Sequence, residues 1–186
     1  MNYPNGIKRE FKNLKSFSNR GMNLEQDLND TNTYYLNSNI AVVYKKPTPI
    51  TINKVDYKSR KDATITEAHF IVPSTTDYNG IYKGKYIDFE AKETKNSTSF
   101  PLSNIHKHQV EHLKKIYNHG GIGFIIVRFC NLSKTYLLFI EDLLEFLENE
   151  TRASIPISYF EEKGHIIKEG ISPRLDYLKI VDRKGV

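Results

Sequence analysis

Asp77, Glu90 and Lys92 have the residue types and the spacing of a metal-dependent hydrolytic site. Side chains alternate between faces along a strand, so Glu90 and Lys92 lie on one face, about 7 Å apart. Turn signals at Asn79-Gly80 and Lys83-Gly84 allow the chain to fold back and bring Asp77 beside Glu90. Two converging carboxylates can hold Mg²⁺, which polarises a phosphoryl oxygen, and a nearby lysine can orient water or stabilise charge. This combination indicates phosphodiester hydrolysis.

The same strand has an apolar face, which separates this pattern from an ordinary surface ion pair. Ile87, Phe89 and Ala91 alternate with the charged residues, and we expect them in the core. Asp88 shares the charged face. An isolated Glu-x-Lys pair is common on exposed strands and by itself indicates no chemistry. The upstream Asp77 at hairpin distance favours a nuclease site over that alternative.

Hydrophobic periodicity places this strand, expected over residues 86–93, in a mixed α/β domain. A first helix is expected from a cap at Ser18 or Asn19 to about residue 36, and a second from Ser103 or Asn104 to residue 120. The other expected strands cover residues 40–46, 50–57, 63–72, 122–130 and 135–140, and a short acidic helix follows them. Helices mixed with at least five strands are typical of this class.

Length and composition exclude several classes of protein. The 186 residues suit one domain with a buried core, and 39% hydrophobic against 26% charged residues excludes wholesale disorder. No run approaches the ~18 apolar residues of a transmembrane helix, and the polar start lacks a signal-peptide core. Cys130 is the only cysteine, which excludes an intrachain disulfide framework and a cysteine zinc cluster. We therefore expect a cytoplasmic protein.

Positive charge dominates most of the chain. Lys and Arg number 27 against 22 Asp and Glu, and residues 141–150 hold five of those acids and no base. The remainder therefore has a formal charge of +10, which suits a polyanionic partner such as nucleic acid. Residues 1–18 contain four bases against one acid and are expected to form a flexible basic arm.

The motif residues resemble the signature of the PD-(D/E)xK nuclease superfamily, and longer blocks of sequence carry a closer resemblance. The blocks are YPNG, NRGMNLE, KKPTPI, STTDYNGIYKGKYIDFEAKET, FPLSNIHKHQ and SPRLDYLKI. Together they resemble the RecU-type Holliday junction resolvases from residue 3 to about residue 180. The long block around Asp77 and Glu90 is far more specific than the superfamily signature alone.

This resemblance implies a fold and a function. The fold would be a restriction-endonuclease-like core, a mixed central β-sheet flanked by helices, with a protruding β-hairpin stalk at about residues 48–70 of a single nuclease domain over 19–186. The function would be Mg²⁺-dependent resolution of Holliday junctions by paired symmetric nicks in DNA recombination and repair, with Mn²⁺ as a substitute. The resemblance further implies a nucleoid-associated homodimer, with a strand-exchange recombinase and a branch-migration motor as partners.

The resemblance also assigns roles to single residues. Asp77 and Glu90 match the metal-binding carboxylates, Thr75 and Gln109 match further metal-site positions, and Lys92 matches the lysine that stabilises the transition state. Gln109 lies on an otherwise apolar helical stripe, so it needs a partner, for which the backbone is the alternative. Glu25 resembles the helix glutamate of such resolvases. The alternative for Glu25 is a structural role, as a solvent-exposed acid in the first turn of the helix, where the helix dipole favours negative charge.

Seven basic residues and one tyrosine, from three regions of the chain, are candidates for DNA contacts. By resemblance, the stalk enters the centre of the junction, where its bases contact phosphates and an aromatic ring stacks on a base. The candidates are Arg20, Lys45, Lys46, Lys54, Tyr57, Lys58, Arg60 and Lys61. The alternative is a solvated hairpin whose lysines protect its edges. Arg174 could contact a phosphate or pair with an acid, for which Asp176 is the nearby candidate.

Three other functions compete with this interpretation. His108-Gln109-Val110-Glu111-His112 fits the inverted zinc-peptidase motif, which also needs a third ligand and an enclosing scaffold. A non-catalytic junction-binding module that recruits or modulates recombination proteins would need only the basic surface and the stalk. A duplex-cutting nuclease of the same superfamily would share the catalytic residues without requiring four-way DNA.

Overall fold

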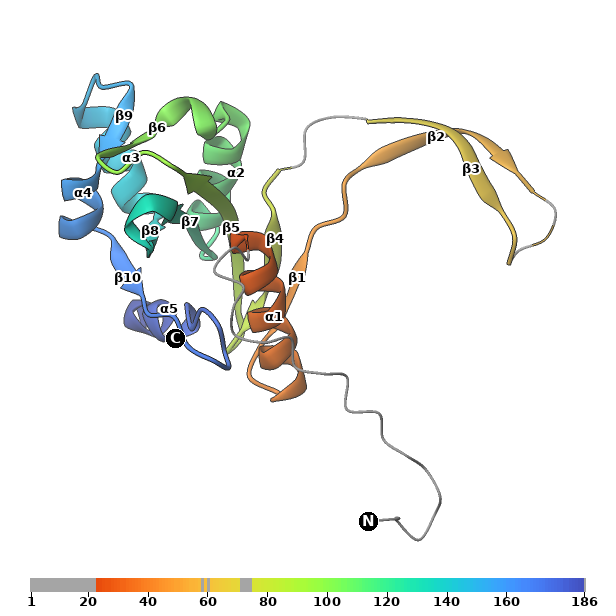
Figure 1. Ribbon diagram of the computed structural model, residues 1–186, viewed down its shortest axis with the longest axis horizontal. Coiled ribbons are helices and arrows are strands. Elements are labelled where there is room, and N and C mark those ends of the chain that lie inside the picture. The colour runs from red at the N-terminus through yellow and green to blue at the C-terminus, as the bar shows by residue number, and fades with distance from the viewer. Residues whose placement is uncertain (1–22, 58, 60, 71–74, 186) are drawn as a thin grey trace, which may run out of the picture.

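A mixed six-stranded sheet forms the centre of the computed structural model, which describes residues 23–57, 59, 61–70 and 75–185 (Figure 1). Its strands are, in spatial order, β1 (Val42–Lys45), β4 (Tyr78–Tyr82), β5 (Lys85–Thr94), β7 (Ile122–Phe129), β8 (Lys134–Phe139) and β10 (His165–Ile167). Only the pairing of β5 with β7 is parallel among these described strands. The mixed sheet with flanking helices confirms the predicted fold class.

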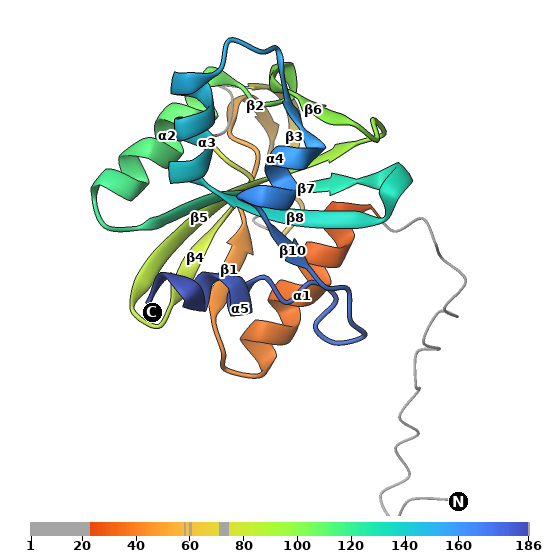
Figure 2. The ribbon, with the colours of Figure 1, turned by 90° about the vertical axis from the view of Figure 1, so that its left-hand side faces the viewer.

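Helices cover both faces of this sheet (Figure 2). One face packs against α1 (Leu24–Asn37) and α5 (Leu178–Val181), and the other against α2 (Lys107–Asn118), α3 (Ile140–Asn149) and α4 (Ile157–Glu162). A second small sheet pairs β6 (Ser99–Pro101) with β9 (Ser154–Pro156), and 3-10 turns cover Leu102–Asn104, Cys130–Leu132 and Asp182–Lys184. Two separate hydrophobic cores result, one on each face. Within the described residues, no helix is long and apolar enough to cross a membrane.

Strand β5 is buried on both faces. On the α1 side, Phe89 stacks between Tyr78 and Phe124, with ring centroids 4.8 and 4.7 Å apart. On the other side, Asp88 and Glu90 are also buried. Because α2 packs over this part of the sheet, the charged face of β5 is an interior surface. Its charged groups therefore need partners within the protein.

The hairpin that precedes the buried strand differs from the expected one. Asn79 and Gly80 lie inside β4, and the turn is made by Lys83 and Gly84, which both have positive φ angles. Gly80 is required by packing, because an added Cβ would lie 2.1 Å from the Val42 carbonyl oxygen of β1. The prediction of a turn at Asn79-Gly80 was therefore wrong.

Both long helices begin later than predicted. The cap of α1 is Asn23, whose side chain accepts a hydrogen bond from the Gln26 N–H at 2.9 Å, while Ser18 and Asn19 lie outside the described residues. α2 begins at Lys107, because the extended backbone at Ile105 separates it from the preceding 3-10 turn.

A long hairpin projects from the body of the molecule (Figure 1). It consists of β2 (Ile50–Asp56) and β3 (Thr64–Phe70), paired antiparallel with an irregularity near Asn53. Every residue of both strands is exposed. The strands therefore form no contact with the central sheet that would bury them. The expected basic arm over residues 1–18 lies outside the described residues.

Candidate active site

The β4–β5 hairpin brings Asp77 next to Glu90. Tyr78, the first residue of β4, pairs with Phe89 of β5, so Asp77 lies opposite Glu90 at the end of the pairing. The Asp77 carboxylate accepts a hydrogen bond from the Ala91 N–H at 3.1 Å. Strand pairing thus places the two carboxylates together, although 12 residues separate them in the sequence.

Lys92 completes this group from the same face of β5. Its ammonium lies 2.6 Å from Glu90 Oε1. Glu90 is only 1% exposed, and among the described residues its Oε2 atom has no hydrogen-bond partner. Burial first, and the Asp77 charge second, raise the pKa of Glu90 to about 7, against the opposing effect of Lys92.

These donors fit a hard divalent cation. A buried carboxylate oxygen that lacks a hydrogen bond is a poorly compensated acceptor, and a cation beside it would supply the missing interaction. In the described part of the chain, no cluster of three or more His, Cys, Asp or Glu side chains could hold a metal. A cation here would therefore bind Asp77 and Glu90 together with hydroxyl, carbonyl or water oxygens.

The raised pKa of Glu90 has a consequence for stability without metal. A carboxyl with a pKa of about 7 in the folded state and 4.5 when unfolded favours folding at low pH. This contribution is lost as the pH rises from about 4.5 through 7. In EDTA at pH 8, we expect Glu90→Gln to raise the free energy of unfolding by about 2–3 kcal/mol, with little difference at pH 4.5. Urea unfolding at both pH values measures this, and an equal gain at both would contradict the assignment.

Two further predicted metal ligands come from different elements. Thr75 lies just before Asp77, and its hydroxyl accepts a hydrogen bond from the Lys46 ammonium at 3.0 Å. Gln109 is buried on α2, where its side-chain oxygen accepts from the His106 backbone N–H at 3.0 Å. A hydrogen bond to the backbone was the alternative considered for this glutamine. The role of Gln109 as a metal ligand therefore stays a prediction.

A pocket of about 220 Å³ opens beside Asp77 and Lys92. Its lining includes Glu25, Lys45, Asp77, Ala91, Lys92 and Glu93. Glu25, at the start of α1, lies 2.5 Å from the Lys45 ammonium, and both side chains are about half exposed. The structure therefore brings Glu25 and Lys45 to the same pocket as Asp77 and Lys92.

Lys46 is not among the residues that line that pocket and belongs to a polar cluster around the buried Asp88. Its ammonium contacts Thr75, Thr76 and Asp88, and its side chain is 15% exposed. The imidazole of His112 on α2 also contacts Asp88, at 3.2 Å. Sequence reasoning assigned no role to Thr76 or Asp88. The position of Asp88 two residues before Glu90 was the available signal.

The zinc-peptidase alternative gains no support from this geometry. His112 is directed toward Asp88, and the His108 ring stacks on that of His106 at 5.4 Å. No third ligand joins them among the described residues.

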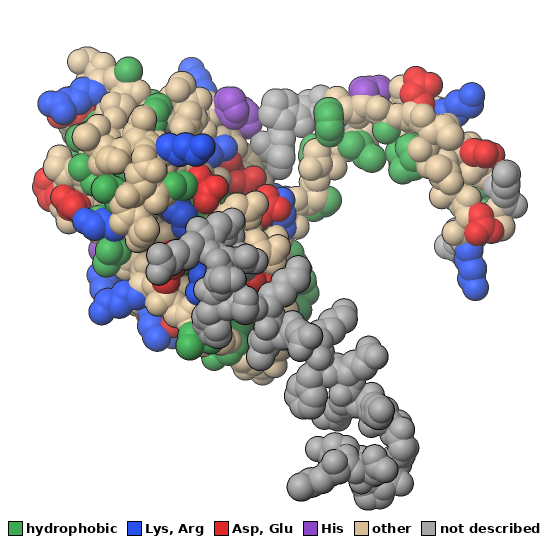
Figure 3. Space-filling view, viewed as in Figure 1, with side chains coloured by type: hydrophobic (Ala, Val, Ile, Leu, Met, Phe, Trp, Pro, Cys, Tyr) green, Lys and Arg blue, Asp and Glu red, His purple; other side chains and the backbone are tan. Residues whose placement is uncertain are grey.

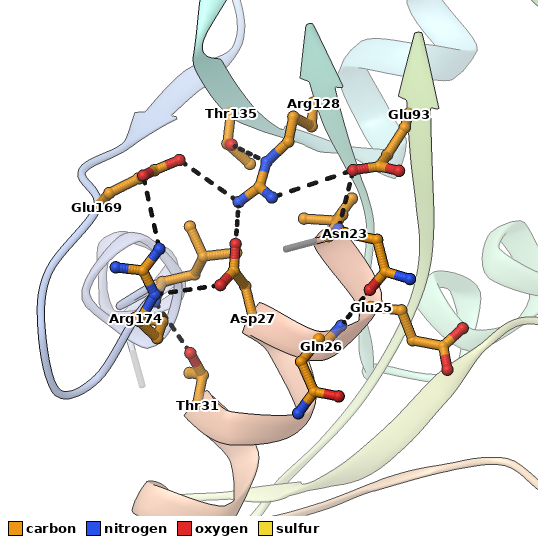
Figure 4. Close-up of polar contacts among 12 residues, drawn as sticks. Asn23, Glu25, Gln26, Asp27, Thr31, Glu93, Arg128, Thr135, Glu169 and Arg174 are labelled. Atoms are coloured by element: carbon orange, nitrogen blue, oxygen red, sulfur yellow. Dashed lines mark hydrogen bonds and ion pairs between the residues drawn. The ribbon is translucent and has the colours of Figure 1, made fainter. Parts of the chain in front are cut away.

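The start of α1 is held in place by a network of ion pairs (Figure 4). Asp27, 2% exposed, lies 2.6 Å from Arg128 and 3.1 Å from Arg174. Glu93 of β5 accepts the Leu24 N–H at 2.8 Å. Figure 4 shows Glu25 pointing away from this network. The network therefore fixes α1 while leaving Glu25 directed outward.

Arg174 has a different partner from the one that its neighbours indicated. The expected nearby partner was Asp176, but that carboxylate accepts the Tyr35 hydroxyl and pairs with Lys179. Arg174 instead reaches Asp27 on α1, 147 residues away in the sequence. The prediction of an Arg174–Asp176 pair was wrong.

The other candidate DNA contacts lie on the projecting hairpin or outside the described residues. Lys54, Tyr57 and Lys61 are exposed on the hairpin, with Tyr57 at 67%. Arg20, Lys58 and Arg60 lie outside the described residues. The hairpin thus presents its described basic side chains to solvent, and none of them lines the pocket.

Comparison with known proteins identifies the family. The family described as "RecU: Recombination protein U" matches residues 19–183. The Holliday junction resolvase RecU of Bacillus mycoides is 54% identical, with 90% of this chain and 85% of the relative covered. The same-named proteins of a Geobacillus species and of Pediococcus pentosaceus are each 50% identical, over 97% and 98% of this chain and 96% of each relative.

A solved structure gives a weaker likeness. Hjc, a Holliday junction resolvase from Archaeoglobus fulgidus, matches with a TM-score of 0.46 and 11% identity, covering 76% of this chain and 94% of Hjc. The assignment to a family rests on the family match and on the sequence identities, and not on this structural likeness. The chain belongs to the RecU family.

Proposed function

We propose that this protein is a Mg²⁺-dependent endonuclease that resolves Holliday junctions by paired symmetric nicks in DNA recombination and repair. One observation carries the proposal: Asp77 meets the buried Glu90, and Lys92 lies 2.6 Å from that carboxylate. This group lies in a chain that is about half identical, over nearly its full length, to proteins named Holliday junction resolvases. A pure binding module would not need it.

The residues of the proposed active site divide the work of hydrolysis. Asp77 and Glu90 hold the cation, with Thr75 and Gln109 as further oxygen donors. When bound, Mg²⁺ polarises the scissile phosphate, and Mn²⁺ can substitute. Lys92 orients the attacking water or stabilises the charge that develops on the phosphate. Glu25 lines the same pocket, where it contacts Lys45, and would be the further acidic group of the site.

Two symmetric nicks call for two active sites in matching orientation, which a two-fold homodimer supplies. Exposed apolar side chains support such an interface. Val42 of β1 and Ile81 of β4 are 47% and 57% exposed and lie side by side in register. Hydrophobic side chains also gather along the inner side of the projecting hairpin (Figure 3). Phe70, at the end of β3, is 75% exposed. Contiguous exposed apolar surface is typical of an interaction site.

Resolution follows strand exchange and branch migration, so we place this protein beside a strand-exchange recombinase and a branch-migration motor at the nucleoid. Both partners handle the same four-way DNA before it is cut.

Cleavage of a labelled four-way junction and of a matched linear duplex tests the proposal. Paired nicks at symmetric positions of the junction alone, lost in EDTA, are expected. Equal cutting of the duplex would indicate a duplex nuclease of the same superfamily. Tight junction binding without cleavage in any divalent metal would indicate a binding module.

The hairpin tip is expected to supply phosphate contacts. Replacing Lys58, Arg60 and Lys61 together by Gln should weaken junction binding and lower the log–log salt slope by about 2–3, since each phosphate contact releases about one counterion. Fluorescence anisotropy over a series of salt concentrations measures both quantities.

The matched control removes three charges elsewhere. Lys163, Lys179 and Arg183 lie on or beside α4 and α5, on the other side of the body from the hairpin (Figure 1). Their replacement by Gln should leave the slope near that of the wild type. An unchanged slope in the tip variant would show that the tip makes no phosphate contact.

A further inference from the structure

Lys46 holds three consecutive residues of the proposed metal site. Its backbone N–H donates to the Asp77 carbonyl oxygen at 2.7 Å. Its ammonium donates to the hydroxyl of Thr75 at 3.0 Å and to that of Thr76 at 2.6 Å. Thr75 and Asp77 are two of the proposed metal ligands, so the positions of both depend on where Lys46 lies.

Asp88 fixes the Lys46 ammonium to the strand that carries Glu90. The two charged groups lie 2.8 Å apart, with the Asp88 side chain fully buried. The hydroxyls of Thr76 and Tyr86 also donate to the Asp88 carboxylate, and the His112 imidazole lies 3.2 Å from it. Asp88 and Glu90 are two residues apart on one face of β5. The Lys46–Asp88 pair thus connects the Thr75–Asp77 segment to β5.

The Lys46 ammonium has no N–H left for a DNA phosphate. A lysine ammonium carries three donors, and here they go to Thr75, Thr76 and Asp88. The neighbouring Lys45, on the other side of the strand, has a side chain 43% exposed and lines the pocket. Lys45 and Lys46 were both predicted to contact DNA, and of this neighbouring pair Lys45 is the one that can do so without breaking a buried contact.

Stability alone does not explain a buried ion pair at this place. Such a pair is often no more stabilising than apolar residues of the same volume, because both charges lose their hydration. What the pair does supply is a fixed position for the groups that it contacts. Groups that orient metal ligands in this way change metal affinity about 10–100-fold when they are replaced.

We propose that Lys46 and Asp88 are positioning residues, which hold Thr75 and Asp77 against Glu90 so that the three can bind one divalent cation. The inference rests on the proposed function, since it takes those residues as metal ligands. It assigns Lys46 to the metal site in place of the DNA contact expected from the sequence.

Mn²⁺ binding to the free protein tests this assignment, with unbound Mn²⁺ measured by electron paramagnetic resonance. In the paired variant Lys46→Met/Asp88→Asn, which leaves no unpaired buried charge, we expect Mn²⁺ affinity to fall about 10–100-fold. Junction affinity in EDTA and its salt slope should stay at the wild-type values. The matched control, Lys45→Met, should show the reverse: unchanged Mn²⁺ affinity, weaker junction binding and a salt slope lower by about one.

Lys46→Arg separates position from charge. Arginine keeps the positive charge, but its planar guanidinium cannot reproduce three bonds from one compact ammonium. If Lys46 positions the metal ligands, Lys46→Arg should also lose Mn²⁺ affinity. If Lys46 contacts DNA instead, Lys46→Arg should keep its affinity for the junction. Unchanged Mn²⁺ affinity in both Lys46 variants, with weaker junction binding in EDTA, would overturn the inference.

Two further variants keep the outcome decisive. If circular dichroism shows that the paired variant does not fold, Thr76→Val removes one of the three Lys46 contacts, and unchanged Mn²⁺ affinity there would count against positioning. Glu90→Gln tests the metal site itself. Wild-type Mn²⁺ affinity in Glu90→Gln would show that the proposed site is misassigned, whatever Lys46 does.

Discussion

Replacing Asp77 by Asn, or Glu90 by Gln, is expected to abolish junction cleavage while leaving junction binding intact. Each substitution preserves the size of the side chain and removes the negative charge that a cation requires. A divalent cation contributes several kcal/mol to the transition state of phosphoryl chemistry, so the single-turnover rate should fall by about 10³-fold or more. The affinity for the junction should hold, because phosphate contacts come from basic side chains elsewhere.

The measurement pairs two assays on the same proteins. Cleavage of a labelled junction is followed in Mg²⁺ at enzyme excess, and binding is followed in EDTA. Asp182→Asn is the matched control, because Asp182 is a carboxylate on the far side of the fold that pairs with Lys83. It should cleave at the wild-type rate. Full cleavage by either active-site variant would refute the assignment of Asp77 and Glu90.

The meeting of Asp77 with Glu90 could be predicted because it depends on local rules. Strand alternation sets the face of Glu90 and Lys92, and a glycine turn sets the length of the hairpin. Two turn positions were predicted, and the turn lies at Lys83-Gly84, not at Asn79-Gly80. Asn79-Gly80 has the composition of a turn, but Gly80 lies within β4 because β1 approaches it too closely for a side chain. That requirement comes from a strand about 40 residues away.

The surroundings of the site could not be predicted either, because they also depend on contacts between elements that are distant in the sequence. Strand alternation places Asp88 and Glu90 on one face of β5 but does not show that α2 covers that face, where both are as buried as Phe89. The partner of Arg174 was sought two residues away and lies on α1 instead. Such partnerships depend on which elements pack together, and a single sequence carries no local signal for them.

The largest expected effect on stability comes from Asp27, at the centre of the network that anchors α1. Its carboxylate receives two guanidinium groups, Arg128 on Oδ2 and Arg174 on Oδ1, and Arg128 is itself 8% exposed. Asp27→Ala leaves Arg128 buried with its main counter-ion removed. We expect the free energy of unfolding to fall by about 3–5 kcal/mol, the range for breaking a buried pair by removing one partner. Urea unfolding at pH 7 measures this.

Two other variants show whether the buried charge is the cause. Asp27→Leu/Arg128→Met removes both charges and should recover much of the loss, because apolar residues can replace a buried pair. Glu161→Ala breaks the exposed pair with Lys134 and should change stability by less than about 1 kcal/mol. A loss below about 1 kcal/mol in Asp27→Ala would show that Glu169 compensates Arg128 by itself.

The same variant separates stability from the chemistry of the pocket. Asp27 and Glu25 lie on the same turn of α1, but Figure 4 shows Glu25 directed away from the network, toward the side on which the pocket lies. If the network only anchors the helix, Asp27→Ala should unfold more readily and still cleave near the wild-type rate well below its unfolding temperature. If the anchor also sets the position of Glu25, cleavage should fall while the protein is fully folded. In that case the loss should match that of Glu25→Gln, because both substitutions would remove the same group from the pocket.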